Sequence, residues 1–139
     1  VNLVGTYIVA RTAARRWISE GCPGCIVNVT SMNGLAAGPN SGAYGPSKAA
    51  IALLTSQMAI EWGPRGINVN AIAPVFTLTA INRALLADPA KLEWVMSRIP
   101  MKRLGELEDL FGPVIFLASP ASNFVNGHVL PVDGGWLGA

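Results

Sequence analysis

Charged residues are scarce in this sequence. Asp, Glu, Lys and Arg make up 13% of its 139 residues, whereas an average soluble domain has about 25%. The net charge is only +2, and no run of Lys or Arg forms a basic patch, so the sequence argues against a nucleic-acid partner. Hydrophobic residues reach 51%. We therefore expect part of an apolar surface to be covered, by a further protein segment or by a second subunit in a homo-oligomer such as a dimer or tetramer.

Long hydrophobic runs are also missing. No apolar stretch approaches the ~20 residues that cross a bilayer, and the amino terminus lacks the basic and apolar regions of a secretory signal. These absences predict a cytoplasmic protein without a membrane partner.

Metal ligands and cysteines are few. His128 is the only histidine, and a structural zinc ion needs four ligands, so we expect no metal site. Cys22 and Cys25 have the CxxC spacing of redox motifs. They lie in a Pro-Gly turn that leads into a predicted strand, not at a helix start, which favours two reduced thiols over a thioredoxin-like centre. A thiol redox module is the alternative reading.

A tyrosine and a lysine stand one helical turn apart in the segment Tyr44-Gly-Pro-Ser-Lys48. In a helix over residues 44–62 their side chains share one face. A free phenol has a pKa of about 10 and is a poor base at neutral pH, but a nearby ammonium favours its ionised form. Ser31 ends the apolar run 25–31 and directs a hydroxyl to the same place. The pattern is typical of general acid-base chemistry, with the serine orienting the reacting oxygen.

Hydrophobic periodicity predicts alternating helices and strands in a single α/β domain. The order predicts a three-stranded parallel sheet with right-handed crossovers. Gly112-Pro113 is expected to kink the last helix or to delay its start, and Pro131 places the last strand at the sheet edge. The predicted elements are helix 1–20, strand 25–31, helix 44–62, strand 67–73, two short helices within 80–104 that break at Asp88-Pro89, helix 106–119 and strand 128–132.

Ordered motifs run through nearly the whole chain. They are Asn2 in Val-Asn-Leu-Val-Gly-Thr, Ser31 in Ile-Val-Asn-Val-Thr-Ser, Tyr44-x-x-x-Lys48, Asn68-Val-Asn-Ala-Ile-Ala-Pro74, Arg103-Leu-Gly-Glu106, Phe116-Leu-Ala-Ser119 and Val132-Asp-Gly-Gly135. Together they resemble the short-chain dehydrogenase/reductase family. The resemblance implies a Rossmann-like, three-layer α/β sandwich with a parallel sheet. Residues 1–139 would form the carboxyl-terminal part of that single domain, with a substrate lid at roughly 75–104.

The resemblance further implies hydride transfer between NAD or NADP and an alcohol or carbonyl substrate. The family's catalytic positions fall on Asn2, Ser31, Tyr44 and Lys48. In the family, the counterpart of Tyr44 passes the proton and that of Ser31 bonds the substrate oxygen. The counterpart of Lys48 also holds the nicotinamide ribose. The counterpart of Asn2 helps to hold a relay water, whereas without the resemblance Asn2 reads as a helix N-cap. The cofactor-binding positions that the resemblance implies are Tyr44, Lys48, Pro74, Val75, Thr77 and Thr79.

The sequence departs from the family pattern at Val75 and in lacking a Gly-rich loop. The family usually has glycine at position 75, and a β-branched side chain there tolerates neither positive φ nor crowding, so we expect altered loop geometry or cofactor affinity. No G-x-G-x-x-G pattern occurs, so the adenosine end of the cofactor site is expected to be missing and strand 25–31 to have an unpaired edge. The alternative interpretation is a catalytically incomplete fragment or a non-catalytic binding subunit.

The apolar residues of the lid have two interpretations. They either line an apolar substrate pocket or pack the lid onto the domain, and we favour packing for most of them. The residues concerned are Leu85, Leu92, Trp94 and Met96.

Overall fold

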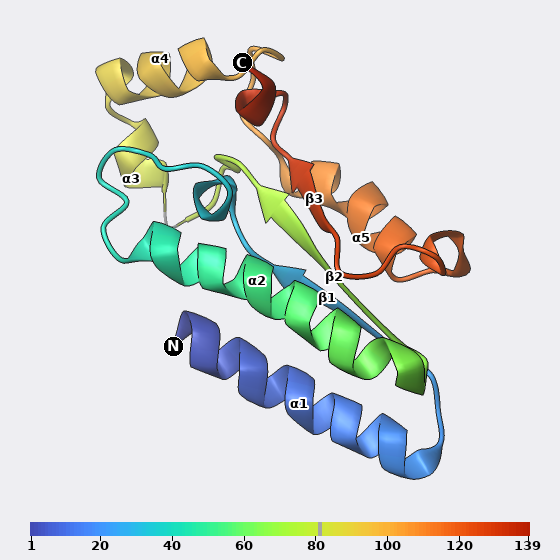
Figure 1. Ribbon diagram of the computed structural model, residues 1–139. Coiled ribbons are helices and arrows are strands. Elements are labelled where there is room, and N and C mark those ends of the chain that lie inside the picture. The colour runs from blue at the N-terminus through green and yellow to red at the C-terminus, as the bar shows by residue number, and fades with distance from the viewer. Residues whose placement is uncertain (81) are drawn as a thin grey trace.

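Three parallel strands form the centre of the structure. The computed structural model describes residues 1–80 and 82–139, without the side chain of Leu85. Over this part of the chain, β1 (Gly24–Val29), β2 (Ile67–Pro74) and β3 (Val129–Val132) form one sheet in the order β1-β2-β3 (Figure 1). Helices connect the strands, as a parallel arrangement requires. The predicted parallel sheet is confirmed, with β1 and β3 at its two edges over the described residues.

The helices follow the predicted order closely. Both long helices and both short lid helices form where the periodicity places them. The region 106–119 divides into a 3₁₀ turn and a short helix that has Gly112-Pro113 in its first turn, so the helix starts later than the predicted 106. The α-helices are α1 (Asn2–Glu20), α2 (Tyr44–Trp62), α3 (Arg83–Leu86), α4 (Pro89–Arg98) and α5 (Phe111–Leu117), and the 3₁₀ turns are η1 (Met32–Gly34), η2 (Gly63–Arg65), η3 (Leu107–Leu110), η4 (Pro120–Ser122) and η5 (Trp136–Gly138).

The helices cover both faces of the sheet and produce three layers (Figure 1). The buried core on the first face joins Ala14 of α1, Met58 of α2 and Val69 of β2. Successive strand residues point to opposite faces. Cys25 of β1 accordingly faces α5 on the second side, where its Sγ donates to the carbonyl oxygen of Leu117 at 3.2 Å. This arrangement confirms the predicted α/β sandwich.

Buried polar side chains fix the strands to the neighbouring elements. Asn28 Nδ2 of β1 donates to Thr55 Oγ1 of α2 at 2.9 Å. In β2, Asn70 Nδ2 donates to Val125 O at 2.8 Å, while Asn70 Oδ1 accepts from the backbone N–H of His128 at 3.0 Å. Because buried amides must be hydrogen-bonded, these pairs set the position of α2 over β1 and the start of β3.

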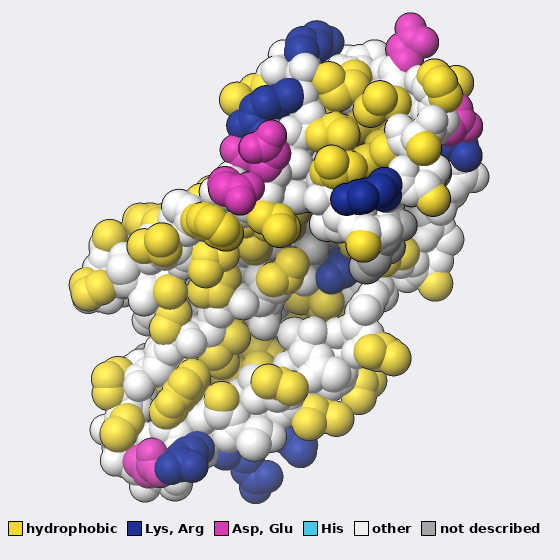
Figure 2. Space-filling model, turned by 180° about the vertical axis from the view of Figure 1, so that it is seen from behind, with side chains coloured by type: hydrophobic (Ala, Val, Ile, Leu, Met, Phe, Trp, Pro, Cys, Tyr) yellow, Lys and Arg dark blue, Asp and Glu magenta, His cyan; other side chains and the backbone are white. Residues whose placement is uncertain are grey.

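Many large hydrophobic side chains remain on the surface. Figure 2 shows them across the middle of the face opposite to the view of Figure 1, with charged side chains mainly toward the upper and lower ends. Among the described residues, no helix combines the length and the apolar character that crossing a bilayer requires. The exposed apolar side chains include Leu3, Val4, Tyr7, Ile8 and Val9 of α1, and Phe111, Ile115 and Phe116 of α5.

Candidate active site

A cavity lies beyond the carboxyl ends of β1 and β2, which is where open parallel sheets bind their ligands. It has a volume of about 360 Å³. Four predicted site residues meet in its wall, namely Ser31, Tyr44, Val75 and Thr79. Residues that are distant in sequence are therefore brought to one place.

Ser31 occupies the turn that follows β1. The strand ends at Val29, two residues earlier than predicted, because the chain then turns into η1. Ser31 is extended, is 8% exposed, and its Oγ accepts a hydrogen bond from the backbone N–H of Asn33 at 3.2 Å. A hydroxyl that accepts one bond retains its own O–H for donation. Ser31 can therefore donate to an oxygen in the cavity.

Tyr44 is the first residue of α2 and is half-exposed at 46%. Ser41 holds this helix start in place. Its carbonyl oxygen accepts from the N–H of Tyr44 at 2.9 Å, and its Oγ accepts from the N–H of Gly45 at 3.0 Å. These bonds satisfy donors that a helix N-terminus leaves unpaired. The phenol is thus carried by an anchored helix end.

The Lys48 ammonium lies beside the Tyr44 ring. Its Nζ is 5.8 Å from the ring centroid and donates to the carbonyl oxygen of Val29 at 2.9 Å. Burial of this side chain lowers the pKa of Lys48 from its ordinary value. At the lysine's own backbone, Thr30 Oγ1 donates to Lys48 O at 2.7 Å. The end of β1 therefore positions both the backbone and the charge of Lys48.

Gly34 allows α2 to approach the turn after β1. A Cβ at this position would lie 2.7 Å from the backbone carbonyl carbon of Lys48 and 2.8 Å from Thr30 Oγ1. No side chain fits there without moving the backbone of α2. The glycine is thus a requirement of close packing next to the site.

Asn2 is not in the cavity lining and contacts α2 instead. Its Nδ2 donates to Ser47 Oγ at 3.1 Å, so α1 contacts α2 one residue before Lys48. The N-cap interpretation is wrong, because Val1 occupies the cap position and Asn2 is the first helical residue. Among the described residues, Asn2 makes no hydrogen bond to Tyr44 or Lys48. Its relay role stays a prediction.

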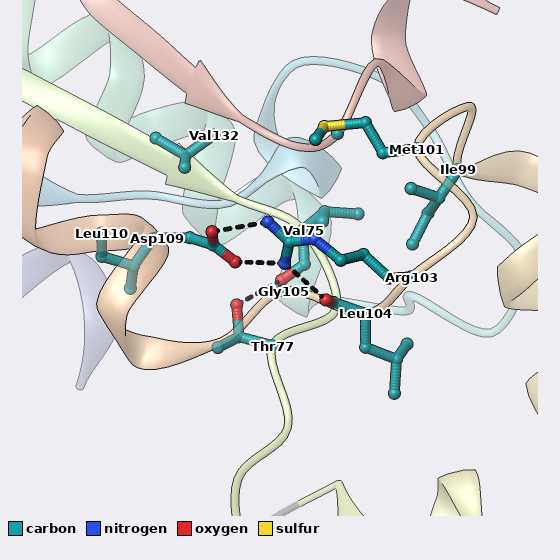
Figure 3. Close-up of a pocket in the computed structure, with 11 residues that line it drawn as sticks. Val75, Thr77, Ile99, Met101, Arg103, Leu104, Gly105, Asp109, Leu110 and Val132 are labelled. Atoms are coloured by element: carbon teal, nitrogen blue, oxygen red, sulfur yellow. Dashed lines mark hydrogen bonds and ion pairs between the residues drawn. The ribbon is translucent and has the colours of Figure 1, made fainter.

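The predicted cofactor residues after β2 are only partly brought together. Val75 and Thr79 reach the Tyr44 cavity, and Asn82 Oδ1 accepts bonds from the N–H of Thr79 at 2.9 Å and from its hydroxyl at 3.3 Å. Thr77 is buried and instead faces a smaller cavity of about 160 Å³ (Figure 3). Pro74 ends β2 opposite Val132 and lies in the lining of neither cavity.

Val75 does not distort the loop. Its φ is not positive, its N–H donates to Val132 O at 3.2 Å, and its side chain packs against the buried cluster that contains Met32 and Trp136. The expected problem of loop geometry is therefore wrong, since valine adopts this backbone without strain. An effect on cofactor affinity through crowding stays a prediction.

An ion pair lies in the wall of the smaller cavity, at the end of the segment 75–104 (Figure 3). The Arg103 guanidinium bonds both carboxylate oxygens of Asp109, at 2.6 and 2.7 Å, and Asp109 also accepts from the N–H of Glu106 at 2.8 Å. Arg103 and this backbone bond hold the pKa of Asp109 well below its usual range. The neighbouring Gly105 N–H donates to Phe76 O at 3.0 Å. The two ends of the lid are thereby tied together.

A larger cavity of about 720 Å³ adjoins Tyr44. It lies between the loop 39–41 and α4, and sequence reasoning identified none of its polar residues except Tyr44. The sequence did contain a sign of this wall, namely the helical spacing of Asp88, Lys91 and Val95, which places Lys91 and Val95 on one face of α4 and Asp88 at its N-cap. The described residues of the lining are Asn33, Pro39, Asn40, Ser41, Tyr44, Phe76, Asp88, Ala90, Lys91, Trp94 and Val95.

The apolar residues of the lid show both predicted behaviours. Leu92 packs against the buried cluster around Trp136, as expected. Trp94 packs on Trp136 with ring centroids 5.7 Å apart and also lines the larger cavity. Met96 is half-buried, and the side chain of Leu85 lies outside the described residues.

The cysteine pair does not resemble an activated dithiol. Cys22 and Cys25 are both free thiols. Burial raises the pKa of the Cys25 thiol, whereas reactive cysteines have a lowered pKa. The structure therefore gives no support to the thiol redox alternative.

A family model described as "Enoyl-(Acyl carrier protein) reductase", one of the short-chain dehydrogenase/reductase models, matches residues 1–137. The chain belongs to the short-chain dehydrogenase/reductase family. Among curated relatives, the 2-dehydro-3-deoxy-D-gluconate 5-dehydrogenase of Dickeya dadantii is 41% identical over 99% of this chain and 54% of the relative. The L-xylulose reductase of Mesocricetus auratus is 40% identical over 99% of this chain and 56% of the relative.

Solved structures of family members have the same fold. Gluconate 5-dehydrogenase from Burkholderia cenocepacia J2315, in complex with NADP and tartrate, matches with a TM-score of 0.96 at 42% identity, over 100% of this chain and 54% of that chain. A 4-hydroxyisoleucine dehydrogenase complexed with NADH matches with a TM-score of 0.96 at 35% identity. The short-chain dehydrogenase/reductase resemblance is therefore confirmed. The chain spans about half the length of the relatives that it matches.

Proposed function

We propose that this chain provides the reacting half of an NAD(P)-dependent oxidoreductase that acts on an alcohol or carbonyl carbon. The observation that carries the proposal is the meeting of Ser31 and Tyr44 in one cavity, with the Lys48 ammonium 5.8 Å from the tyrosine ring. Two relatives, a 2-dehydro-3-deoxy-D-gluconate 5-dehydrogenase and an L-xylulose reductase, are named for this chemistry.

Each side chain has a distinct role in this proposal. Tyr44 gives its phenolic proton to the substrate oxygen in reduction and receives it in oxidation. Ser31 donates a hydrogen bond to the same oxygen and thereby fixes its position. The Lys48 ammonium stabilises the negative charge that develops on the phenol oxygen when the proton leaves. Asn2 positions the start of α2 through Ser47, and its relay role depends on a water held nearby.

The residues at this end of the sheet fit the nicotinamide end of a cofactor. Hydroxyl and amide groups line the cavity together with the apolar side chains of Met32, Val75 and Phe76, and the φ of Val75 is not positive. Lys48 and Tyr44 are the proposed partners of the ribose hydroxyls, and Thr79 with the backbone of Val75 those of the carboxamide. Pro74 and Thr77 support that loop from behind. The chemistry that NAD or NADP supplies when bound is hydride transfer to or from the substrate carbon.

The substrate class follows from the relatives and from the larger cavity. Relatives named for gluconate, xylulose and rhamnose act on polyhydroxylated compounds. The polar groups of the 720 Å³ cavity suit such a substrate, and the volume falls within the range of small-molecule sites. We propose a polyhydroxylated alcohol or carbonyl substrate.

The test is a scan of NADH and NADPH oxidation by the full-length protein with a panel of carbonyl compounds. Tyr44→Phe removes the proton donor and is expected to lower kcat by about 10² to 10⁴-fold. Tyr7→Phe is the matched control, because Tyr7 lies on the exposed side of α1. Cofactor binding without turnover of any carbonyl compound would instead identify the alternative, a non-catalytic binding subunit.

We further propose that the protein is a homo-oligomer in which α1 and α2 pair between subunits. The exposed apolar residues Val4, Val9 and Ile60 on these helices support the proposal, because so many uncovered side chains are unusual on a monomer. Sedimentation at micromolar concentration is expected to give a dimer or tetramer, and a compact monomer would overturn it.

A further inference from the structure

The larger cavity beside Tyr44 has a charged wall on α4. Asp88 and Lys91 lie at the start of this helix, and the facing wall carries amide and hydroxyl groups of Asn40 and Ser41. Within the part of the chain that the structure describes, Asp88 and Lys91 are the only charged residues in the lining. The charge balance of this pair therefore decides which end groups a substrate can present there.

The Asp88 carboxylate is already used by the protein. Its Oδ1 accepts from the backbone N–H groups of Ala90 at 3.0 Å and Lys91 at 3.5 Å, so that Asp88 caps α4. Desolvation raises the pKa of Asp88, but these backbone bonds outweigh it and the net shift is downward, which keeps the group ionised. An anion at this position is balanced by the positive end of the helix dipole.

The Lys91 ammonium is only weakly engaged. Its Nζ lies 3.4 Å from Asp88 Oδ2 in an ion pair, and its side chain is 56% exposed. An ammonium has three N–H donors. In residues 1–80 and 82–139, the Asp88 carboxylate is the one protein group recorded against this ammonium. Since the Asp88 carboxylate takes at most one of these three donors, the other two are left for a ligand.

Trp94 and Phe76 complete the cavity with apolar walls. Trp94 is held edge-on to Trp136, with ring centroids 5.7 Å apart, and Phe76 lies 5.7 Å from the same indole. The two aromatic walls are therefore packed against one indole, and the polar groups of the lining come from other residues. A ligand that contacts both the apolar walls and the polar groups has a carbon chain with several hydroxyl groups and one charged end.

We infer that Lys91 is a specificity-determining residue that binds a carboxylate of the substrate, so that the enzyme prefers a polyhydroxy carboxylate over a neutral polyol. This inference rests on the proposed function, because the reacting carbon lies at Tyr44. The carboxylate then lies at the α4 end of the cavity, and the chain hydroxyls meet Asn40, Ser41 and their neighbours.

The inference is tested by calorimetric binding of gluconate and of sorbitol, which differ in one end group, carboxylate against hydroxymethyl, to the full-length protein. The wild type is expected to bind gluconate about 5- to 10-fold more tightly, since one charge-assisted bond at a half-exposed site contributes about 1 to 1.4 kcal/mol. Lys91→Met should remove this preference and Lys91→Arg should retain it. Lys102→Met is the matched control, because Lys102 is a lysine of the same lid outside the cavity lining.

Equal binding of both compounds by the wild type, binding of neither at millimolar concentration, or an unchanged preference in Lys91→Met would overturn the inference. Failure of the proposed function would be seen in a different result from failure of this inference. A protein that turns over no carbonyl compound but prefers gluconate through Lys91 retains the anion site without the oxidoreductase. A protein that reduces carbonyl compounds with a KM unaffected by Lys91→Met retains the oxidoreductase and loses the anion site.

Discussion

Gly34→Ala tests the packing that positions Lys48. The added Cβ would lie 2.7 Å from the Lys48 carbonyl carbon and 2.9 Å from the Ala49 nitrogen, both backbone atoms of α2. Carbon atoms in van der Waals contact are about 3.5 to 4.0 Å apart, so α2 has to retreat by close to 1 Å. Overpacking of this kind costs about 1 to 3 kcal/mol. Weakening the Thr30–Lys48 bond of 2.7 Å adds about 1 kcal/mol.

The expected consequence is a loss of about 2 to 4 kcal/mol in the free energy of unfolding. With a urea m value of about 1 to 3 kcal/mol/M, the midpoint of urea denaturation should fall by about 0.7 to 4 M. The retreat also displaces Tyr44 and Lys48 from Ser31, and a misplacement of this size costs about 100-fold in kcat.

Gly5→Ala is the matched control, because Gly5 lies inside α1, no proline follows it, and a Cβ there meets nothing within 4 Å. It should be neutral or stabilise the helix by about 0.5 to 1 kcal/mol. The reasoning is refuted if Gly34→Ala has the urea midpoint and the kcat of the wild type.

Three further predictions follow from single contacts. The pKa of Asp109 in the folded protein lies below its unfolded value of 3.8, so the stability that Asp109 contributes is present above pH 3.8 and is lost as the pH falls. Asp109→Asn should therefore flatten the acid unfolding curve between about pH 4 and 2. An unchanged curve would contradict this. Thr55→Val leaves the buried amide of Asn28 without its acceptor and should cost about 1 to 3 kcal/mol in urea denaturation, a loss that the double variant with Asn28→Leu should partly recover. Because burial lowers the pKa of Lys48, the loss of activity at alkaline pH should begin below pH 10.5. Lys48→Arg should shift this loss to higher pH, since a guanidinium stays protonated. An identical alkaline limb of the pH profile in both proteins would exclude Lys48 as the cause of the loss.

The fold could be predicted well because its signals are local. Helices 1–20 and 44–62 carry their own periodicity, and Gly21 ends α1 in the left-handed conformation that glycine adopts readily. The lid helices break at Asp88-Pro89, as the sequence indicates, because Asp88 caps α4 and proline suits its first turn. The end of β1 was placed two residues too late, since the turn into η1 depends on contacts with α2.

The site could be predicted in part. Tyr44 and Lys48 are one turn apart on a helix, so their proximity needed no tertiary information. Val75 was misjudged because a motif position says nothing about the φ that the backbone adopts there. Lys91 was missed, since Lys91 and Tyr44 line the same cavity only because α4 packs near the loop 39–41 in the tertiary structure.

The sequence by itself determined the elements and their order, and it determined that a phenol and an ammonium share one helix face, because both depend on spacings of a few residues. Only the tertiary structure decided that the Lys48 ammonium bonds the end of β1, that Asn2 reaches Ser47, and that Thr77 turns away from the Tyr44 cavity. These outcomes depend on how separate elements pack. Packing is set by side-chain volume and hydrogen-bond satisfaction between segments that no local pattern connects.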